Sequence, residues 1–99
     1  MSNLKLVIEN VAETDMLSIA EYIAKDNKRA AANLLKIFYG TFNNLTIYPE
    51  LGLLRSDFTY KDVRFYTVKK HYLIIYTVND SEIHILRVLS SYQDICGLL

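Results

Sequence analysis

The segment of residues 63–89 constrains the fold of this chain more than any other, because it reads as three consecutive β-strands. β-Branched, aliphatic and aromatic residues fill residues 63–68, 72–78 and 83–89, a composition that suits a pleated, half-buried surface. The two breaks between these runs are short, polar and turn-like. We therefore expect neighbouring strands to run antiparallel, as a meander.

The middle strand of this meander is apolar on both faces. Successive residues of a strand point to opposite sides of a sheet, so alternate positions share a face. One face carries Tyr72, Ile74, Tyr76 and Val78, and the other carries Leu73, Ile75 and Thr77. The chain's own helices can cover one of these faces. We expect a partner to cover the other.

The first part of the chain predicts a strand followed by an amphipathic helix. In residues 4–9 the apolar Leu4, Leu6 and Ile8 alternate with Lys5, Val7 and Glu9, as expected for a strand. Asn10 is the expected N-cap of the helix, with Glu13 three residues on, as in a capping box. The helix buries one stripe, Ala12, Met16, Ile19, Ala20 and Ile23. Asp15 lies off this stripe and is expected to be solvent-exposed.

A second helix follows after a short break. Asn27 can cap it, and Pro49 ends it by biasing Tyr48 out of the helical region. Its apolar stripe is Ala31, Leu34, Leu35, Phe38, Phe42 and Leu45. Gly40 interrupts the helix and is a candidate for close approach to the first helix. We expect a loop over residues 50–61, a turn over 90–93 and a short helical or irregular tail over 94–99.

These elements predict one α+β domain over residues 1–99, in the order β-α-α-β-β-β, with a helical hairpin packed on a mostly antiparallel sheet. Lys plus Arg and Asp plus Glu both number 11, so the chain lacks the basic excess typical of nucleic-acid binders. A local basic patch stays possible between Arg55 and Lys70. The single Cys96 excludes an internal disulfide, and no run approaches a membrane span, so a cytoplasmic location is expected.

Four motifs carry a family resemblance when they are taken in their order along the chain. They are the first-helix pattern of Asp15, Ile19 and residues 22–24; residues 31–45 with the exit at 48–52; the strand 72–76; and the strand 83–89. Together they resemble the RelE/ParE superfamily, the toxins of bacterial type II toxin–antitoxin pairs. The resemblance spans nearly the whole chain, and the last strand is similar to that of the ParE branch.

The resemblance implies a growth-arresting toxin that is held inactive by a cognate antitoxin of the ParD or RelB kind. The antitoxin is expected to lay an extended, partly helical segment over the helical hairpin and the sheet. Candidate antitoxin contacts are Tyr22, Tyr39, Tyr66 and Tyr76, because tyrosine combines apolar area with a polar tip. RelE-like members cut messenger RNA on the ribosome, whereas ParE-like members inhibit DNA gyrase.

The RelE-like alternative requires chemistry that this chain supplies only in part. RNA cleavage needs a base or an oriented hydroxyl, cations for the phosphorane charge and an acid. Arg64 stands where that branch places a phosphate-side Lys, and Tyr92 is the nearest candidate acid. Tyr66 and Leu73, however, stand in place of a second Lys and a catalytic Arg, and Gln93 lies near a further Arg position. Leu cannot stabilise negative charge, so the nuclease interpretation is weakened.

The ParE-like interpretation is preferred, with a relic of reduced activity as a further alternative. It retains Arg87, although that branch often continues into a run rich in His and Arg, which residues 90–93 do not reproduce. Candidate target contacts are Arg87, Tyr92, Gln93 and Arg64. The competing role for Arg87 is a partly buried ion pair with Glu9 or Asp94.

Neither a cofactor nor a metal is expected. His71 and His84 are interpreted as structural, because no second His, Cys or carboxylate stands at metal-ligand spacing from them.

Overall fold

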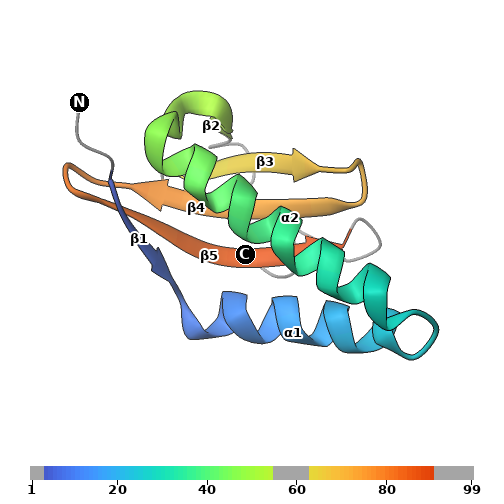
Figure 1. The fold of residues 1–99 in the computed structure, drawn as a ribbon. Helices are drawn as coiled ribbons and strands as arrows, with labels where there is room; N and C mark the ends of the chain where they lie inside the picture. Colours follow the sequence, from blue (N-terminus) through green and yellow to red (C-terminus); the bar gives the residue numbers. More distant parts are fainter. Residues whose placement is uncertain (1–3, 55–62, 91–99) are drawn as a thin grey trace.

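Two helices lie on one face of a five-stranded sheet in the part of the chain that the structure describes (Figure 1). The structure is a computed structural model and describes residues 4–54 and 63–90. Its elements in chain order are β1 (Lys5–Ile8), α1 (Asn10–Ala24), α2 (Lys28–Ile47), the 3-10 helix η1 (Pro49–Leu51), β2 (Leu53–Leu54), β3 (Arg64–Val68), β4 (Tyr72–Val78) and β5 (Glu82–Ser90). The α+β class and the helical hairpin on a mostly antiparallel sheet are confirmed.

The sheet has the strand order β1-β5-β4-β3-β2. The meander of β3, β4 and β5 is antiparallel, as predicted, and β2 adds to it antiparallel to β3. β1 pairs with β5 in parallel, so the first and last described strands lie side by side at one edge. Figure 1 shows α1 lying below β5 and α2 crossing the sheet obliquely.

The start of α1 differs from the prediction. Asn10 is the first helical residue, and Glu9 occupies the N-cap position with extended backbone angles, φ −66° and ψ 150°. Within the described residues the cap has no side-chain hydrogen bond, so the predicted capping box is wrong. The physical reason is that the helix starts one residue earlier than predicted: the Glu9 carbonyl oxygen accepts the Glu13 N–H at 3.0 Å, so Asn10 lies inside the helix. The Glu9 carboxylate does not cap the helix because it is bound by His84.

The second helix agrees with the prediction at both ends. Asn27 is its N-cap, and the Asn27 side-chain oxygen accepts a hydrogen bond from the Ala30 N–H at 3.0 Å. The helix ends at Ile47, before Pro49. The idea that Gly40 allows close approach to α1 is wrong, because no described atom outside the adjacent residues and the nearby backbone of α2 lies within 4 Å of the place where a Cβ would stand.

A two-residue strand was missed between α2 and the meander. Leu53 pairs with Phe65 and Leu54 pairs with Arg64, which makes β2 an edge strand where we expected a loop. Both leucines are exposed, at 67% and 54% of their maximum. The sequence did not predict this strand, because two residues are too few to show the alternation typical of a strand.

The core has a part on each face of the sheet. The larger cluster joins α1 and α2 to the sheet and is centred on Met16, Phe38, Phe42, Ile74 and Tyr76. The smaller one on the opposite face contains Val63, Phe65, Ile75 and Leu89, with Leu73 and Leu86 half-buried against it. The expectation that a partner covers this second face is wrong at its centre, where Ile75 and Leu89 are fully buried within the chain itself.

A β-bulge in β5 changes which residues share a face. Ile75 pairs with Arg87 but the next residue, Tyr76, pairs with Ile85, so one residue of β5 is extra. After the bulge the alternation shifts by one position. Ile85 therefore lies in the helix-side cluster and Leu89 in the opposite one, although uninterrupted alternation would place them together.

Candidate functional site

Arg87 lies against α1 and is bound by Asp15 through two hydrogen bonds. Arg87 Nε donates to Asp15 Oδ2 at 2.7 Å and Nη2 donates to Oδ1 at 3.0 Å. Asp15 Oδ2 also accepts the backbone N–H of Val88 at 3.1 Å. The hydrogen bonds to Asp15 raise the pKa of Arg87 above its usual value. The arrangement fixes the guanidinium in a bidentate pair, which Arg geometry favours.

The partner of Arg87 differs from both candidates named from the sequence. Glu9 is bound to His84, and Asp94 lies outside the described residues. Asp15, which was expected to be solvent-exposed, has a side chain only 14% exposed, and that of Arg87 is 23% exposed. The helical pattern did not predict the burial of Asp15, because an acidic residue beside an apolar stripe is usually solvent-exposed. Only the position of β5 shows that Asp15 has a partner.

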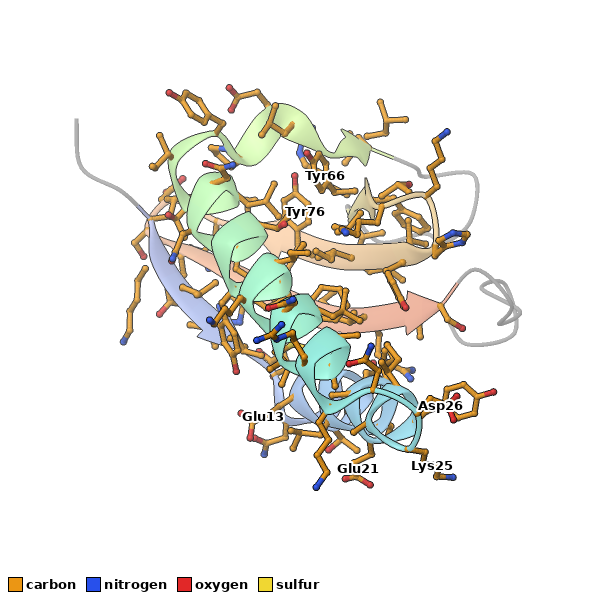
Figure 2. All side chains as sticks on the ribbon, turned by 45° about the vertical axis from the view of Figure 1, so that its right-hand side comes forward. Glu13, Glu21, Lys25, Asp26, Tyr66 and Tyr76 are labelled. Carbon is orange, nitrogen blue, oxygen red and sulfur yellow. The ribbon has the colours of Figure 1, made fainter. Side chains whose placement is uncertain are left out.

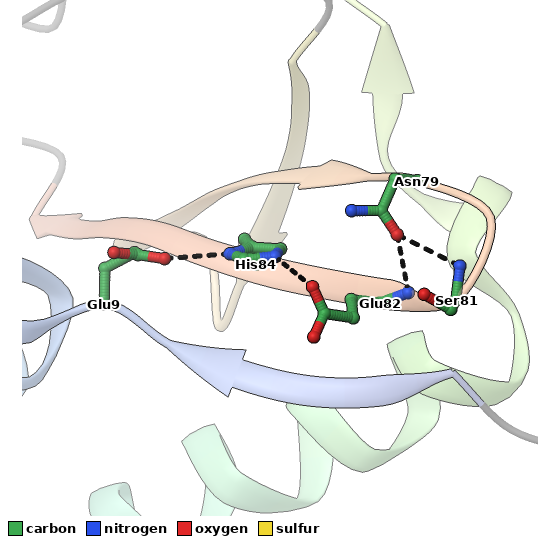
Figure 3. A network of polar contacts seen from close by, with 5 residues as sticks. All are labelled: Glu9, Asn79, Ser81, Glu82 and His84. Atoms are coloured by element: carbon green, nitrogen blue, oxygen red, sulfur yellow. Dashed lines mark hydrogen bonds and ion pairs between the residues drawn. The ribbon is translucent and has the colours of Figure 1, made fainter.

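His84 lies between two carboxylates (Figure 3). Its Nδ1 is 2.8 Å from Glu9 Oε2, and its Nε2 is 2.9 Å from Glu82 Oε1. The hydrogen bonds to Glu9 and Glu82 raise the pKa of His84, and the one from His84 lowers the pKa of Glu82. The cluster thus ties the end of β1 to β5.

Arg64 and Tyr76 both bind the short segment that follows α2. Arg64 Nη1 donates to the carbonyl oxygen of Gly52 at 2.8 Å. The Tyr76 hydroxyl donates to the carbonyl oxygen of Pro49 at 2.6 Å and accepts the N–H of Gly52 at 2.8 Å. Burial raises the pKa of Tyr76. These contacts fasten η1 and β2 to the meander.

Tyr76 is fully buried by these contacts, so the prediction that it meets an antitoxin disagrees with the structure. The physical reason is its hydroxyl, which is used up by two backbone groups of residues 49–52. In Figure 2, Tyr66 and Tyr76 lie near η1 and β2, on the other side of the molecule from the charged residues labelled around α1. Tyr66 is half-buried against the helix-side core.

Two cavities adjoin at the start of β4, where Tyr72 follows the turn after β3. The larger is about 580 Å³ and is lined by Asp15, Ser18, Ile19, Tyr22, Ile23, His71, Tyr72, Val88 and Ser90. The smaller is about 320 Å³ and is lined by Ile23, Ala30, Asn33, Leu34, Ile37, Lys69, His71 and Tyr72. Three residues line both cavities, Ile23, His71 and Tyr72. We call the two together the Tyr72 groove.

The predicted site residues do not gather at one place. Tyr22 lines the Tyr72 groove and is 74% exposed, whereas Tyr39 lies on α2, 44% exposed and in edge contact with Phe42. Arg87 contacts Asp15, which also lines the groove, but Arg64 lies at the β2 edge. Tyr92 and Gln93 lie outside the described residues.

A second apolar surface lies between the end of α2 and β2. It consists of exposed large residues that are close in sequence, Ile47, Tyr48, Leu51, Leu53 and Leu54. Contiguous exposed apolar surfaces on small proteins often mark sites where another molecule binds. Sequence reasoning overlooked this surface because it treated residues 50–61 as a loop.

Over residues 4–54 and 63–90, no group of three or more His, Cys, Asp or Glu is placed to hold a metal ion. Among the described helices, none is both long and apolar enough to span a membrane.

A comparison with solved structures finds a chain of the same fold. A chain described as "Chromosomal ParDE TA system from P. aeruginosa" superposes with a TM-score of 0.71 at 20% identity, over 88% of this chain and 95% of that one. At this identity the likeness shows the fold alone: both chains share the arrangement of helices and sheet described above.

A family model then narrows the assignment. The model for the ParE toxin of the type II toxin–antitoxin system, parDE, matches residues 6–95, and the chain belongs to this family. Among curated proteins no sequence matches the chain.

Proposed function

We propose that this ParE-family toxin arrests growth by binding DNA gyrase in the cytoplasm and that a cognate antitoxin neutralises it. The observation that carries the proposal is the family match over residues 6–95, which includes β5 and its Arg87. Gyrase binding is a protein–protein contact, so it requires an exposed binding surface and no catalytic site.

The state of the two sheet arginines supports docking over RNA cleavage. Arg64 donates to the Gly52 carbonyl oxygen at 2.8 Å, and Arg87 is held in a bidentate pair by Asp15. A cation that stabilises a phosphorane must already present its N–H donors toward the position where the negative charge develops. These two guanidinium groups already donate to acceptors within the chain, which leaves only their remaining N–H groups for a phosphate, whereas a fixed Arg suits a protein interface.

The Tyr72 groove supports a protein partner for the antitoxin role. The lining of its larger cavity includes the apolar residues Ile19, Ile23 and Val88, together with Tyr22, which is highly exposed. Apolar grooves of this kind accept one face of an amphipathic helix, whose side chains anchor at intervals of three or four residues. An antitoxin segment that orders on binding would bury this surface.

Expression of the toxin alone, followed by paired readouts of DNA damage and translation, tests the target. We expect a DNA-damage response and filamentation, inhibition of purified gyrase in a supercoiling assay, and restored growth when the antitoxin is co-expressed. Arrest of translation without DNA damage, with codon-register cuts seen by primer extension, would reject the gyrase target in favour of an RNase. Under that RNase alternative, Arg64→Ala should abolish the codon-register cuts.

Unchanged growth would also decide the matter. If overexpression has no effect and gyrase keeps its activity, while the antitoxin still binds, the chain is a relic that has lost its target contact. The antitoxin arm is tested separately, by co-purification of the toxin with the product of an adjacent small gene.

A further inference from the structure

The two-sided contact of His84 is only satisfied when the ring carries two protons. A neutral imidazole has one N–H and one lone pair, whereas an imidazolium donates from both nitrogens. Here both nitrogens face carboxylate oxygens, Glu9 Oε2 at 2.8 Å and Glu82 Oε1 at 2.9 Å. Loss of one proton would turn a lone pair toward a carboxylate and make one of the two contacts repulsive.

The Glu9 end of this cluster lies at the junction of β1 and α1. The Glu9 N–H donates to the carbonyl oxygen of Ile85 at 3.0 Å, and its carbonyl oxygen accepts the Glu13 N–H at 3.0 Å. Glu9 therefore closes the β1–β5 pairing and starts the helix at the same point. Because its side chain does not cap the helix, the contact with His84 is what its carboxylate contributes.

The Glu82 end lies at the turn between β4 and β5. The N–H groups of Ser81 and Glu82 both donate to Asn79 Oδ1, at 3.0 and 2.7 Å, which fixes the turn (Figure 3). The His84 imidazole therefore connects the turn before β5 with Glu9, the residue between β1 and α1.

The groups that surround His84 come from three strands, and the charged ones come from two of them, β1 and β5. β1 supplies Glu9 at its end and Lys5, which pairs in register with Glu82 and contributes to its lowered pKa. β5 supplies Glu82, and β4 places the uncharged Thr77 opposite His84. Two negatively charged carboxylates thus lie near one lysine and one histidine. The net charge of these four side chains is zero only when His84 is protonated.

We propose that Glu9, His84 and Glu82 form a proton-controlled clamp that fastens β1 and the first turn of α1 to β5. When His84 loses its second proton, β1 and that first turn loosen. The loosening stops at Asp15, because its hydrogen bonds to Arg87 and to the Val88 N–H fasten α1 to β5 independently of His84. Since β1 is the edge strand beside β5, the clamp sets how firmly this edge of the sheet is closed.

The direction of the pH dependence follows from the two pKa shifts. The folded pKa of His84 is raised, so its contribution is complete below the ordinary value of about 6.5 and is lost as pH rises through the raised value. The folded pKa of Glu82 is lowered, so its contribution is present above its ordinary value and is lost as pH falls through the lowered one. The clamp is closed between these limits.

NMR titration of the His84 ring, combined with amide hydrogen exchange, tests the clamp in the whole purified chain. We expect His84 to titrate above the ordinary histidine value. We expect opening at the Glu9 amide, corrected for the intrinsic effect of pH on exchange, to become severalfold more frequent as His84 deprotonates. The Val88 amide, bound to Asp15, should not change over that range.

Two variants separate the clamp from a general effect of pH. His84→Gln should abolish the pH dependence of opening at Glu9, and His71→Gln, which alters the other histidine, should keep it. If His84→Gln fails to fold, Glu9→Gln should lower the titration midpoint of His84 instead. The clamp is rejected if His84 titrates at or below the ordinary value, if opening at Glu9 does not depend on pH, or if the dependence survives in His84→Gln.

Discussion

The Asp15 carboxylate binds Arg87 and the backbone of Val88 at once, and so joins α1 to β5 across 72 residues of sequence. The two residues belong to two motifs of the family resemblance, the first helix and the last strand. Their pairing gives a physical reason why a chain of this kind carries both. The bulge beside Arg87 shifts the alternation of β5 next to this contact.

We expect Asp15→Ala to lower the free energy of unfolding by about 2 kcal/mol. The substitution leaves a half-buried guanidinium without its carboxylate and removes the acceptor of the Val88 N–H; the partial exposure of the pair keeps the cost below that of a fully buried one. Urea unfolding measures the difference. The control is Glu21→Ala, at an exposed site of the same helix, which should stay within about 0.5 kcal/mol of the parent. Equal effects of the two variants would show that the pair contributes nothing.

The exposed ring of Tyr22 provides a test of the antitoxin surface. We expect Tyr22→Ala to weaken antitoxin binding by about tenfold, because aromatic rings beside an apolar groove are frequent anchors of an interface. Unfolding stability should hardly change, since the ring is 74% exposed. Calorimetric titration with the antitoxin measures the affinity.

Tyr48→Ala is the matched control for Tyr22→Ala. Tyr48 is also an exposed tyrosine, at 53%, but it lies at the end of α2 on the second apolar surface. If Tyr48→Ala weakens binding and Tyr22→Ala does not, the antitoxin uses that second surface and not the Tyr72 groove.

Sequence patterns predicted the parts of this fold that depend on neighbouring residues. The strands 64–68, 72–78 and 82–90 follow from alternation and composition, and the Asn27 cap and the stop before Pro49 follow from local chemistry. The strand order was not predicted, because parallel pairing of β1 with β5 depends on contacts between the two ends of the chain.

The polar contacts of the candidate site were hidden for a related reason. Glu9 has its partner 75 residues away, and Asp15 has its partner 72 residues away. A carboxylate near a helix start is compatible with capping, with solvation or with a distant ion pair, and composition does not choose among them. Tyr76 was assigned to an interface for the same reason, since a buried hydroxyl with two backbone partners leaves no local signature.

The corrected helix start leads to opposite expectations for two asparagines. Asn27→Ala should destabilise the protein by about 1 kcal/mol, because the Ala30 N–H loses its acceptor. Asn10→Ala should change stability by less than about 0.5 kcal/mol, because Asn10 is an exposed residue inside the helix and does not cap it. Thermal or urea unfolding of both variants measures this. If Asn10→Ala lowers stability as much as Asn27→Ala does, Asn10 caps the helix after all, as the sequence predicted.

Two glycines should respond to alanine in opposite directions. A Cβ on Gly52 would stand 2.5 Å from the Tyr76 hydroxyl and 2.7 Å from its Cε1, so the buried ring must move and its hydrogen bonds to residues 49–52 must weaken. We expect Gly52→Ala to cost about 1–3 kcal/mol. At Gly40, within α2, no described atom outside the adjacent residues and the nearby backbone of α2 lies within 4 Å of the new methyl group, and alanine should stabilise the helix by about 0.5–1 kcal/mol.

Urea unfolding of the two glycine variants, side by side, checks the Tyr76 contact from the backbone side. Hydrogen exchange at the Gly52 amide adds a local readout, since this N–H is protected by the Tyr76 hydroxyl at 2.8 Å. Gly52→Ala should expose that amide, and Gly40→Ala should not. If alanine at Gly52 is as harmless as alanine at Gly40, the segment after α2 can part from β4 at little cost, and Tyr76 does not hold it to the sheet.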